Sequence, residues 1–261
     1  MKIAVTSPIY LTNNFQLDLL DRMTMSLLSK QHSLIFIPVE NYVHSHFRNM
    51  IYNTRSLDTI IVNGRLPQCV AKAWNDGISK ARELNVDYVL VVNSDIVLRS
   101  DCIDNLVGFA NRHNEGVMWT AGQFSNLPEL ETAVLNLDDN NSSPHPSMSA
   151  FLVKPNFHDI MGKFDENFIP AYFEDNDMHA RIALSDQTAL VYGGAIFFHY
   201  GSGIIRTDLG AKISVETANL GAYFVSKWGH GVVGEVTDMK QVYYKHPYNE
   251  NDKPLSYWRG V

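Results

Sequence analysis

Short, continuous apolar runs alternate in this chain with longer segments whose apolar residues recur at helical spacing. Four runs have the length of buried strands: Ile3–Thr6, Leu34–Ile37, Thr59–Asn63 and Tyr88–Val92. Two segments between them each carry one apolar helix face, made of Phe15, Leu19, Leu20, Met23, Leu27 and Leu28 in the first and of Val70, Ala73, Trp74, Gly77, Ile78 and Ala81 in the second. This alternation predicts an α/β fold in which a Rossmann-like, mostly parallel central sheet is flanked by helices. Sheets of this kind bind ligands beyond the carboxyl ends of their strands.

The second half of the chain continues the pattern less regularly. The expected elements are helices over 101–111, 157–162 and 215–228, a helix that begins near Asp175, and strands over 117–120, 150–153, 189–192 and 195–198. The polar stretch 122–146 predicts a long loop that is either functional or mobile. At 261 residues the chain is expected to form a single continuous domain.

Composition narrows the function classes. The formal net charge of −7 argues against a general nucleic-acid-binding surface, because such a surface needs cations to neutralise phosphates. No apolar run approaches the ~20 residues that cross a bilayer, and Met1–Thr6 enters a strand directly without a signal-peptide pattern, so we expect a cytoplasmic protein with no transmembrane segment. Cys69 and Cys102 each begin a predicted helix, which favours packing roles over a disulfide or zinc site.

The residues Asn93, Ser94 and Asp95 directly follow the predicted strand Tyr88–Val92. An aspartate in this position is often only a turn residue. Its carboxylate can also bind a hard divalent cation that keeps its other positions for phosphate oxygens and water. The position of Asp95 at a strand end favours the metal role.

Three acids gather where the helix near residue 175 begins: Glu174, Asp175 and Asp177. Helix capping explains a carboxylate here, since it accepts backbone N–H bonds and typically contributes ~1 kcal/mol. Capping leaves the density of negative charge unexplained, because mutual repulsion costs stability unless a cation or a substrate hydroxyl interacts with it. Arg181, four residues after Asp177, is expected to offset part of that repulsion. Glu174 and Asp175 are therefore candidates for catalysis as well as capping.

His199 ends an apolar run and precedes the turn Gly201–Gly203. A lone histidine at a strand end is more often a hydrogen-bonded structural residue, but the company of Asp95 favours a ligand of the same metal or a donor to phosphate. Tyr42, His44 and His46 are expected to form a polar loop. The chain contains no Gly-x-Gly-x-x-Gly after its first strand, no Gly-x-x-x-x-Gly-Lys-Ser/Thr and no Gly-x-Ser-x-Gly, which disfavours dinucleotide oxidoreductases, P-loop NTPases and α/β-hydrolases.

Across nearly its whole length the chain resembles the family 2 glycosyltransferases of the GT-A fold, especially bacterial and phage members related to rhamnosyltransferases. The most specific part of the resemblance is the block from Phe164 to Arg181. The other matching segments are Val5-Thr6-Ser7-Pro8, Asn63-Gly64, Trp74-Asn75-Asp76-Gly77, Asn93-Ser94-Asp95, His199 and Tyr223–Gly229.

The resemblance implies a role for each matching residue. Thr6, Ser7 and Pro8 would line the nucleotide pocket, Glu40 would contact the base or ribose, and Asn63 and Arg65 would lie beside the nucleotide. Asn93-Ser94-Asp95 would replace the family's Asp-x-Asp motif, with Asp95 and His199 as ligands of Mg2+ or Mn2+ and with Asn93 nearer the ribose. Asp175 would be the general base, and Glu174 would help to hold the acceptor. The nucleotide-binding half would span about 1–98, the acceptor and catalytic half about 99–235, and a C-terminal tail 236–261.

The implied activity is a metal-dependent, inverting transfer of a sugar from a nucleoside-diphosphate sugar to an acceptor hydroxyl. A diphosphate leaving group neutralised by a cation needs no acid partner, so one base suffices, and one base gives inversion. The acceptor stays open among a glycan, a lipid-linked sugar, a protein and modified bases in DNA, the last being typical of phage enzymes in the infected bacterial cytoplasm. A nucleotidyltransferase is disfavoured, because Thr6–Asn14 has no glycine-rich phosphate loop. A nucleotide-sugar- or glycan-binding module without turnover is the alternative from another class.

Overall fold

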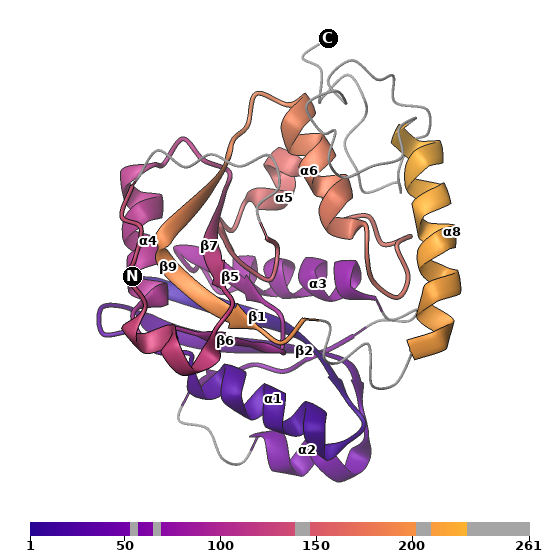
Figure 1. The fold of residues 1–261 in the computed structure, drawn as a ribbon, viewed down its shortest axis with the longest axis horizontal. Coiled ribbons are helices and arrows are strands. Elements are labelled where there is room, and N and C mark those ends of the chain that lie inside the picture. The colour runs from indigo at the N-terminus through magenta and orange to yellow at the C-terminus, as the bar shows by residue number, and fades with distance from the viewer. Residues whose placement is uncertain (53–56, 65–68, 139–146, 202–209, 229–261) are drawn as a thin grey trace.

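A computed structural model describes residues 1–52, 57–64, 69–138, 147–201 and 210–228. In this part of the chain a nine-stranded sheet has the order β3-β2-β1-β5-β8-β7-β9-β6, with β4 beside β2 (Figure 1). The strands are β1 Lys2–Leu11, β2 Ser33–Val43, β3 Asp58–Thr59, β4 Val62–Asn63, β5 Tyr88–Val92, β6 Ile96–Leu98, β7 Met118–Phe124, β8 Ala150–Val153 and β9 Ala189–His199. The helices are α1 Asn14–Met25, α2 Ser45–Tyr52, α3 Val70–Glu83, α4 Cys102–Arg112, α5 Phe157–Met161, α6 Glu174–Leu184 and α8 Gly210–Trp228, with a 3-10 helix at Leu127–Thr132.

The sheet is parallel in its first part and mixed in its second. Strand β1 pairs in parallel with β2 and β5, and β7 pairs in parallel with β9. Strand β8 lies antiparallel between β5 and β7, and β6 lies antiparallel to β9. The predicted α/β sheet flanked by helices is confirmed.

Helices cover both faces of the sheet because successive strand residues point to opposite sides. Ile3 and Val5 on β1 belong to a core that includes side chains of α1 and α4, whereas Ala4 belongs to a second core with side chains of α3, α5 and α6. Cys69 and Cys102 are both buried free thiols, as their expected packing roles require. Within the described residues, no helix is both long enough and apolar enough to cross a membrane.

Several local predictions were wrong. The run Thr59–Asn63 forms two separate two-residue strands at the sheet edge, β3 and β4. The run Leu34–Ile37 is only part of β2, which continues through Pro38 to Val43. Pro38 is tolerated because it lies in the gap between the pairings of β2 with β3 at Phe36 and with β4 at Val39, where no neighbouring strand needs its missing N–H. Tyr42 belongs to β2 and His46 to α2 instead of to a polar loop.

Helix α3 approaches β1 closely at one glycine. A Cβ atom added at Gly77 would lie 1.9 Å from Oγ1 of Thr6, and that hydroxyl donates a hydrogen bond of 2.9 Å to the carbonyl of Ile37 on β2. The close contact fixes α3 over the middle of β1. Cys69, whose Sγ accepts from the backbone N–H of Lys72, caps the start of α3 at this end of the sheet.

Helix α8 is joined to the rest of the molecule by buried charges. Nζ of Lys227 lies 2.5 Å from a carboxylate oxygen of Asp165 and 2.6 Å from one of Asp177, and Asp177 also pairs with Arg181. The Trp228 indole donates to Asp177 at 2.8 Å. Burial disfavours ionisation of Asp165, but the charge and hydrogen bond of Lys227 outweigh it and lower the pKa of that carboxyl. In this buried cluster between α6 and α8, two carboxylates, of Asp165 and Asp177, thus face two cations, of Arg181 and Lys227.

Candidate functional site

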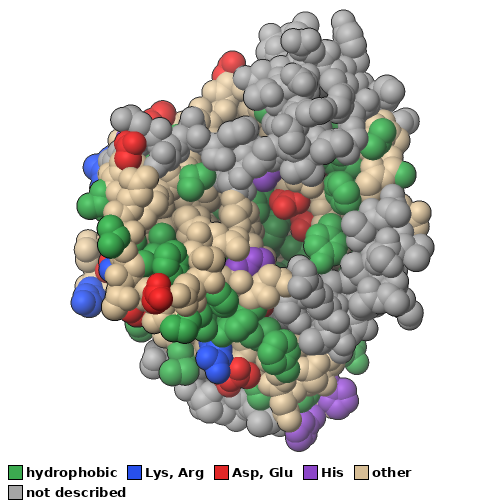
Figure 2. Space-filling view, in the orientation of Figure 1, with side chains coloured by type: hydrophobic (Ala, Val, Ile, Leu, Met, Phe, Trp, Pro, Cys, Tyr) green, Lys and Arg blue, Asp and Glu red, His purple; other side chains and the backbone are tan. Residues whose placement is uncertain are grey.

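A cavity of about 430 Å3 opens at the carboxyl ends of β1 and β5. Its wall is assembled from β1, the segment after β5, the segment before β8, the end of β9 and the turn that leads into α6. The lining residues are Pro8, Tyr10, Asn41, Cys69, Val70, Trp74, Asn93, Ser94, Asp95, Ser147, Met148, Ser149, Pro170, Ala171, Tyr172, Glu174, Asp175 and His199. Figure 2 shows the hollow, with acidic and histidine side chains inside it and hydrophobic side chains around them.

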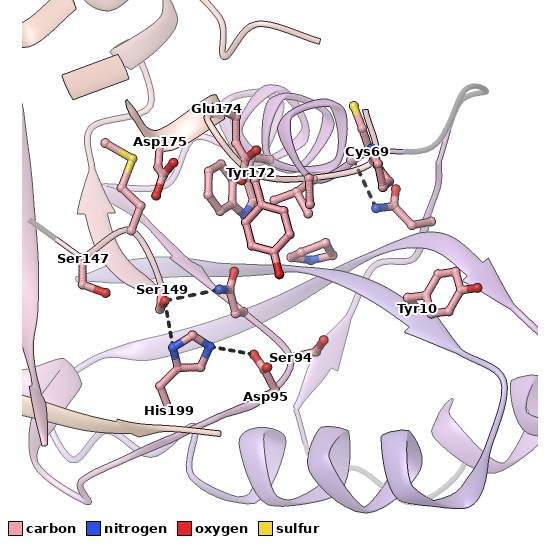
Figure 3. Close-up of a pocket in the computed structure, with 18 residues that line it drawn as sticks. Tyr10, Cys69, Ser94, Asp95, Ser147, Ser149, Tyr172, Glu174, Asp175 and His199 are labelled. Carbon is pink, nitrogen blue, oxygen red and sulfur yellow. Dashed lines mark hydrogen bonds and ion pairs between the residues drawn. The ribbon is translucent and has the colours of Figure 1, made fainter. Parts of the chain in front are cut away.

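Strand pairing brings Asp95 and His199 together from positions 104 residues apart. Ile96 on β6 is opposite His199 on β9, and the backbone N–H of Tyr200 donates to the carbonyl of Asp95 at 3.0 Å. The two side chains consequently meet, with Nε2 of His199 3.2 Å from Oδ1 of Asp95. On the other side of the imidazole, Nδ1 lies 3.4 Å from Oγ of Ser149 (Figure 3).

The acids Glu174 and Asp175 lie in the first turn of α6, on the opposite side of the cavity from Asp95 and His199 (Figure 3). Glu174 is buried, and its Oε2 has no hydrogen-bond partner among the residues that the structure describes. Burial, together with the negative charge of Asp175, raises the pKa of Glu174 well above its ordinary value. The pair therefore favours a neutral Glu174 beside Asp175.

The third acid of this group has a different position. Asp177 is fully buried in the cluster with Arg181 and Lys227 and does not line the cavity. The expected ion pair between Asp177 and Arg181 is present. The three acids that are close in sequence are thus separated in the structure: Glu174 and Asp175 line the cavity, and Asp177 lies in the core.

The residues predicted to bind the nucleotide are only partly brought to the cavity. Pro8, Asn93 and Ser94 line it, together with Asp95. Thr6, Ser7, Glu40 and Asn63 are outside the lining, and Arg65 is not among the described residues.

Each of the four has a local reason for its position. Thr6 is covered by Gly77 of α3, and Ser7 is fully buried on the opposite face of β1. Glu40 forms an ion pair of 2.5 Å with Arg48 of α2. Asn63 is exposed on the edge strand β4.

Several lining residues were not expected from the sequence. Ser149 joins the site through two contacts, since its Oγ lies near His199 and also accepts from the Asn93 amide at 3.3 Å. Tyr172 stands next to the acids in the turn before α6. The position of Tyr172 inside the block Phe164–Arg181 was a usable signal, whereas nothing in the sequence marks Ser149 as a neighbour of His199.

The site has the donor atoms for a divalent cation but not a complete ligand set. No group of three His, Cys, Asp or Glu side chains that could hold a metal occurs in the described residues. An imidazole nitrogen and a carboxylate oxygen 3.2 Å apart do suit Mn2+ or Mg2+, provided that a ligand and water supply the other positions. The residues present therefore fit a cation that is shared with a bound diphosphate.

No protein-family model and no curated protein sequence matches this chain. The structure is similar to a crystal structure of GalNAc-T7 with UDP, GalNAc and Mn2+, at a TM-score of 0.60 and 10% identity, over 92% of this chain and 54% of that one. It is also similar to residues 1–349 of S. aureus TarS, at a TM-score of 0.54 and 14% identity over 88% and 74% of the two chains. For the same fragment in complex with UDP, the TM-score is 0.53 and the identity 13%, over 88% of this chain and 72% of that one. The chain spans about half of the length of the GalNAc-T7 chain. These neighbours are GT-A glycosyltransferases, and the chain has the GT-A fold.

Proposed function

We propose that this protein is a glycosyltransferase that moves a sugar from a nucleoside-diphosphate sugar to an acceptor hydroxyl, with inversion and with Mg2+ or Mn2+ as its cofactor. The observation that carries the proposal is a single cavity with the Asp95–His199 pair on one side and the Glu174–Asp175 pair on the other. Sugar transfer needs charge neutralisation at the leaving group and a base at the nucleophile, separated by the width of a sugar. The GT-A fold and the UDP and Mn2+ of structural neighbours support the same chemistry.

The charge of the cavity supports a requirement for a cation. Its described lining contains three acids and no Lys or Arg, so His199 is the one basic side chain that this part of the wall offers to a diphosphate. Asp95 and His199 would hold the cation, and Ser149 would orient the imidazole through Nδ1. The bound cation would neutralise the charge that develops on the departing diphosphate.

Asp175 is the proposed general base. Burial and the charge of Asp175 raise the pKa of Glu174, which disfavours its ionised form as a nucleophile on the sugar and favours Asp175 as the base of the pair. Asp175 would accept the proton of the acceptor hydroxyl while that oxygen attacks the anomeric carbon from the face opposite the diphosphate. A single displacement of this kind inverts the configuration. Glu174 would donate a hydrogen bond within the acceptor region.

The donor nucleotide would lie along the other end of the cavity. Pro8, Asn93 and Ser94 are the predicted nucleotide contacts that line it, and Tyr10 and Asn41 lie in the same wall. The side-chain amide of Asn93 donates a hydrogen bond to Oγ of Ser149, and its backbone N–H donates to the Ser149 carbonyl at 2.9 Å. Asn93, as the proposed ribose contact, and His199, as a proposed metal ligand, would thus be linked through Ser149.

Replacing Asp175 by Asn tests the assignment of the base. Because a positioned base typically accelerates proton transfer by about 10²–10⁴-fold, we expect the variant to lose activity by that factor while it still binds the nucleoside diphosphate. Asp58→Asn is the matched control, since Asp58 is exposed on edge strand β3. A folded Asp175→Asn variant with wild-type transfer would remove Asp175 as the base.

Donor hydrolysis separates an enzyme from a binding module. Release of nucleoside diphosphate from a panel of UDP-, dTDP- and GDP-sugars is measured with Mn2+ and then with EDTA. A transferase is expected to release diphosphate from at least one donor in the presence of the metal only. Binding of a donor without any release, with or without candidate acceptors, would favour the module.

A further inference from the structure

The turn that leads into α6 has an uncommon backbone. Tyr172 and Phe173 are consecutive non-glycine residues with positive φ, 82° and 71°. Side chains with a Cβ atom disfavour this left-handed region, so the turn stores strain that persists only where surrounding contacts determine the conformation. The contacts of these two side chains therefore indicate which interactions hold the turn in this conformation.

Phe173 is anchored away from the cavity, on α8. Its ring centroid lies 5.7 Å from that of Phe224, and 6.4 Å from that of Phe168. A Cβ atom added at Gly221 of α8 would lie only 3.3 Å from Cζ of Phe173, so this glycine leaves room for the ring. Phe168 and Phe224 are themselves almost fully buried, which makes the anchor rigid.

Tyr172 points the other way. It lines the cavity, and Figure 3 shows its ring extending from the start of α6 across the open space, with the hydroxyl directed toward the strand end that carries Asp95. The ring lies between the acids Glu174 and Asp175 on one side and Asp95 with His199 on the other. With Phe173 anchored on α8, the left-handed turn directs its neighbour into the cavity.

We propose that Tyr172 is the platform for the transferred sugar and thereby helps to select the donor. The inference rests on the proposed function, since the reacting carbon of the sugar must lie between the diphosphate near Asp95 and the base Asp175, and this is where the ring stands. The face of an aromatic ring carries partial negative charge, and the C–H bonds on one face of a pyranose carry partial positive charge, so the two stack. The strained turn is explained as the device that places the ring there.

The experiment compares sugar nucleotides with their own diphosphates. Affinities for a UDP-sugar, dTDP-sugar or GDP-sugar and for the matching UDP, dTDP or GDP are measured by calorimetry with Mn2+ for wild type, Tyr172→Phe and Tyr172→Gly. Glycine adopts the left-handed turn without strain, so Tyr172→Gly removes the ring without forcing the backbone to change. We expect Tyr172→Gly to lower the affinity for the sugar nucleotide by about 3- to 10-fold and the affinity for the diphosphate by less than about 2-fold. Tyr172→Phe keeps the ring, so we expect both of its affinities to stay within about 2-fold of the wild-type values.

Asn85→Gly is the matched control for the backbone. Asn85 also has a positive φ, 50°, but is exposed beyond the end of α3 and does not line the cavity, so its replacement is expected to leave both affinities unchanged. Equal binding of the sugar nucleotide by Tyr172→Gly and wild type would overturn the inference, as would a loss in Tyr172→Phe as large as in Tyr172→Gly. Wild-type protein that binds no sugar nucleotide and no diphosphate would instead contradict the proposed function itself, and the platform with it.

Discussion

Among single side chains, Glu174 gives the clearest dependence on pH. Its pKa is raised in the folded protein by burial and by the charge of Asp175. The folded state therefore binds a proton that the unfolded state has already released at pH values above the ordinary pKa of 4.5. Stability falls as pH rises from that value through the raised pKa, because ionisation then costs the folded state more than the unfolded state.

Glu174→Gln keeps a neutral side chain of similar shape and removes this titration. Relative to wild type, we expect the variant to have nearly equal stability below pH 4.5 and a growing advantage as the pH rises above it. Urea unfolding at a series of pH values measures the difference. A stability difference that does not change with pH would mean that Glu174 has no raised pKa in the fold.

The sequence predicted which charged residues meet at the cavity better than it predicted the rest of the cavity wall. Asp95, Glu174, Asp175 and His199 do share a cavity, because each lies at the end of a strand or the start of a helix that could be recognised. Their roles stay predictions. The positions of Thr6 and Ser7 were not predictable, because β1 continues to Leu11 and α3 covers part of it. Which part of a long strand faces a cavity depends on the helix that packs over it, and that contact is not local in sequence.

Among the elements, the contact of α3 with β1 should be intolerant of a single methyl group. Gly77→Ala would place Cβ 1.9 Å from the Thr6 hydroxyl, which is buried and tied to the Ile37 carbonyl. Either α3 or the strand must move, so we expect a loss of about 1–3 kcal/mol in the free energy of unfolding and weaker nucleotide binding at the end of β1.

Gly108→Ala on α4 is the control for Gly77→Ala. The nearest atom to a Cβ at Gly108 is Nη1 of Arg112 at 3.6 Å, an ordinary contact, so this helix should gain up to about 1 kcal/mol from the better helix former. Denaturant unfolding of both variants provides the comparison. Equal effects of the two substitutions would show that α3 is free to shift on β1.

The arrangement of the elements also shows what sequence patterns cannot predict. The apolar runs located β5 and β8 well, but strand direction is absent from such a pattern, so the antiparallel pairings of β8 and β6 could not be foreseen. The pairing of Asp177 with Arg181 follows from i,i+4 spacing, whereas Lys227 joins the same cluster from 50 residues away. Long-range partners of this kind depend on tertiary packing.

For the whole molecule, the proposed site makes metal and nucleotide binding interdependent. Asp95 and His199 would supply two ligands, and within the described residues no third His, Cys, Asp or Glu completes the set. A cation held by two side chains alone should bind weakly, and a diphosphate beside acids and without Lys or Arg partners in the described lining should bind weakly too. Each is expected to stabilise the fold markedly only in the presence of the other.

Thermal unfolding with UDP, dTDP and GDP, each with Mn2+ or with EDTA, tests this coupling. Ligand at about 100 times its dissociation constant stabilises a fold by about 2.7 kcal/mol, which for a chain of this size raises Tm by about 5–10 °C. We expect such a shift for at least one nucleotide with Mn2+, a much smaller one with EDTA, and loss of the difference in Asp95→Asn. The base that gives the shift would name the donor class. An equal shift with Mn2+ and with EDTA would show that the diphosphate is held without the cation, and the carboxylate of Asp95 would then need another role, such as fixing the His199 ring against Ser149.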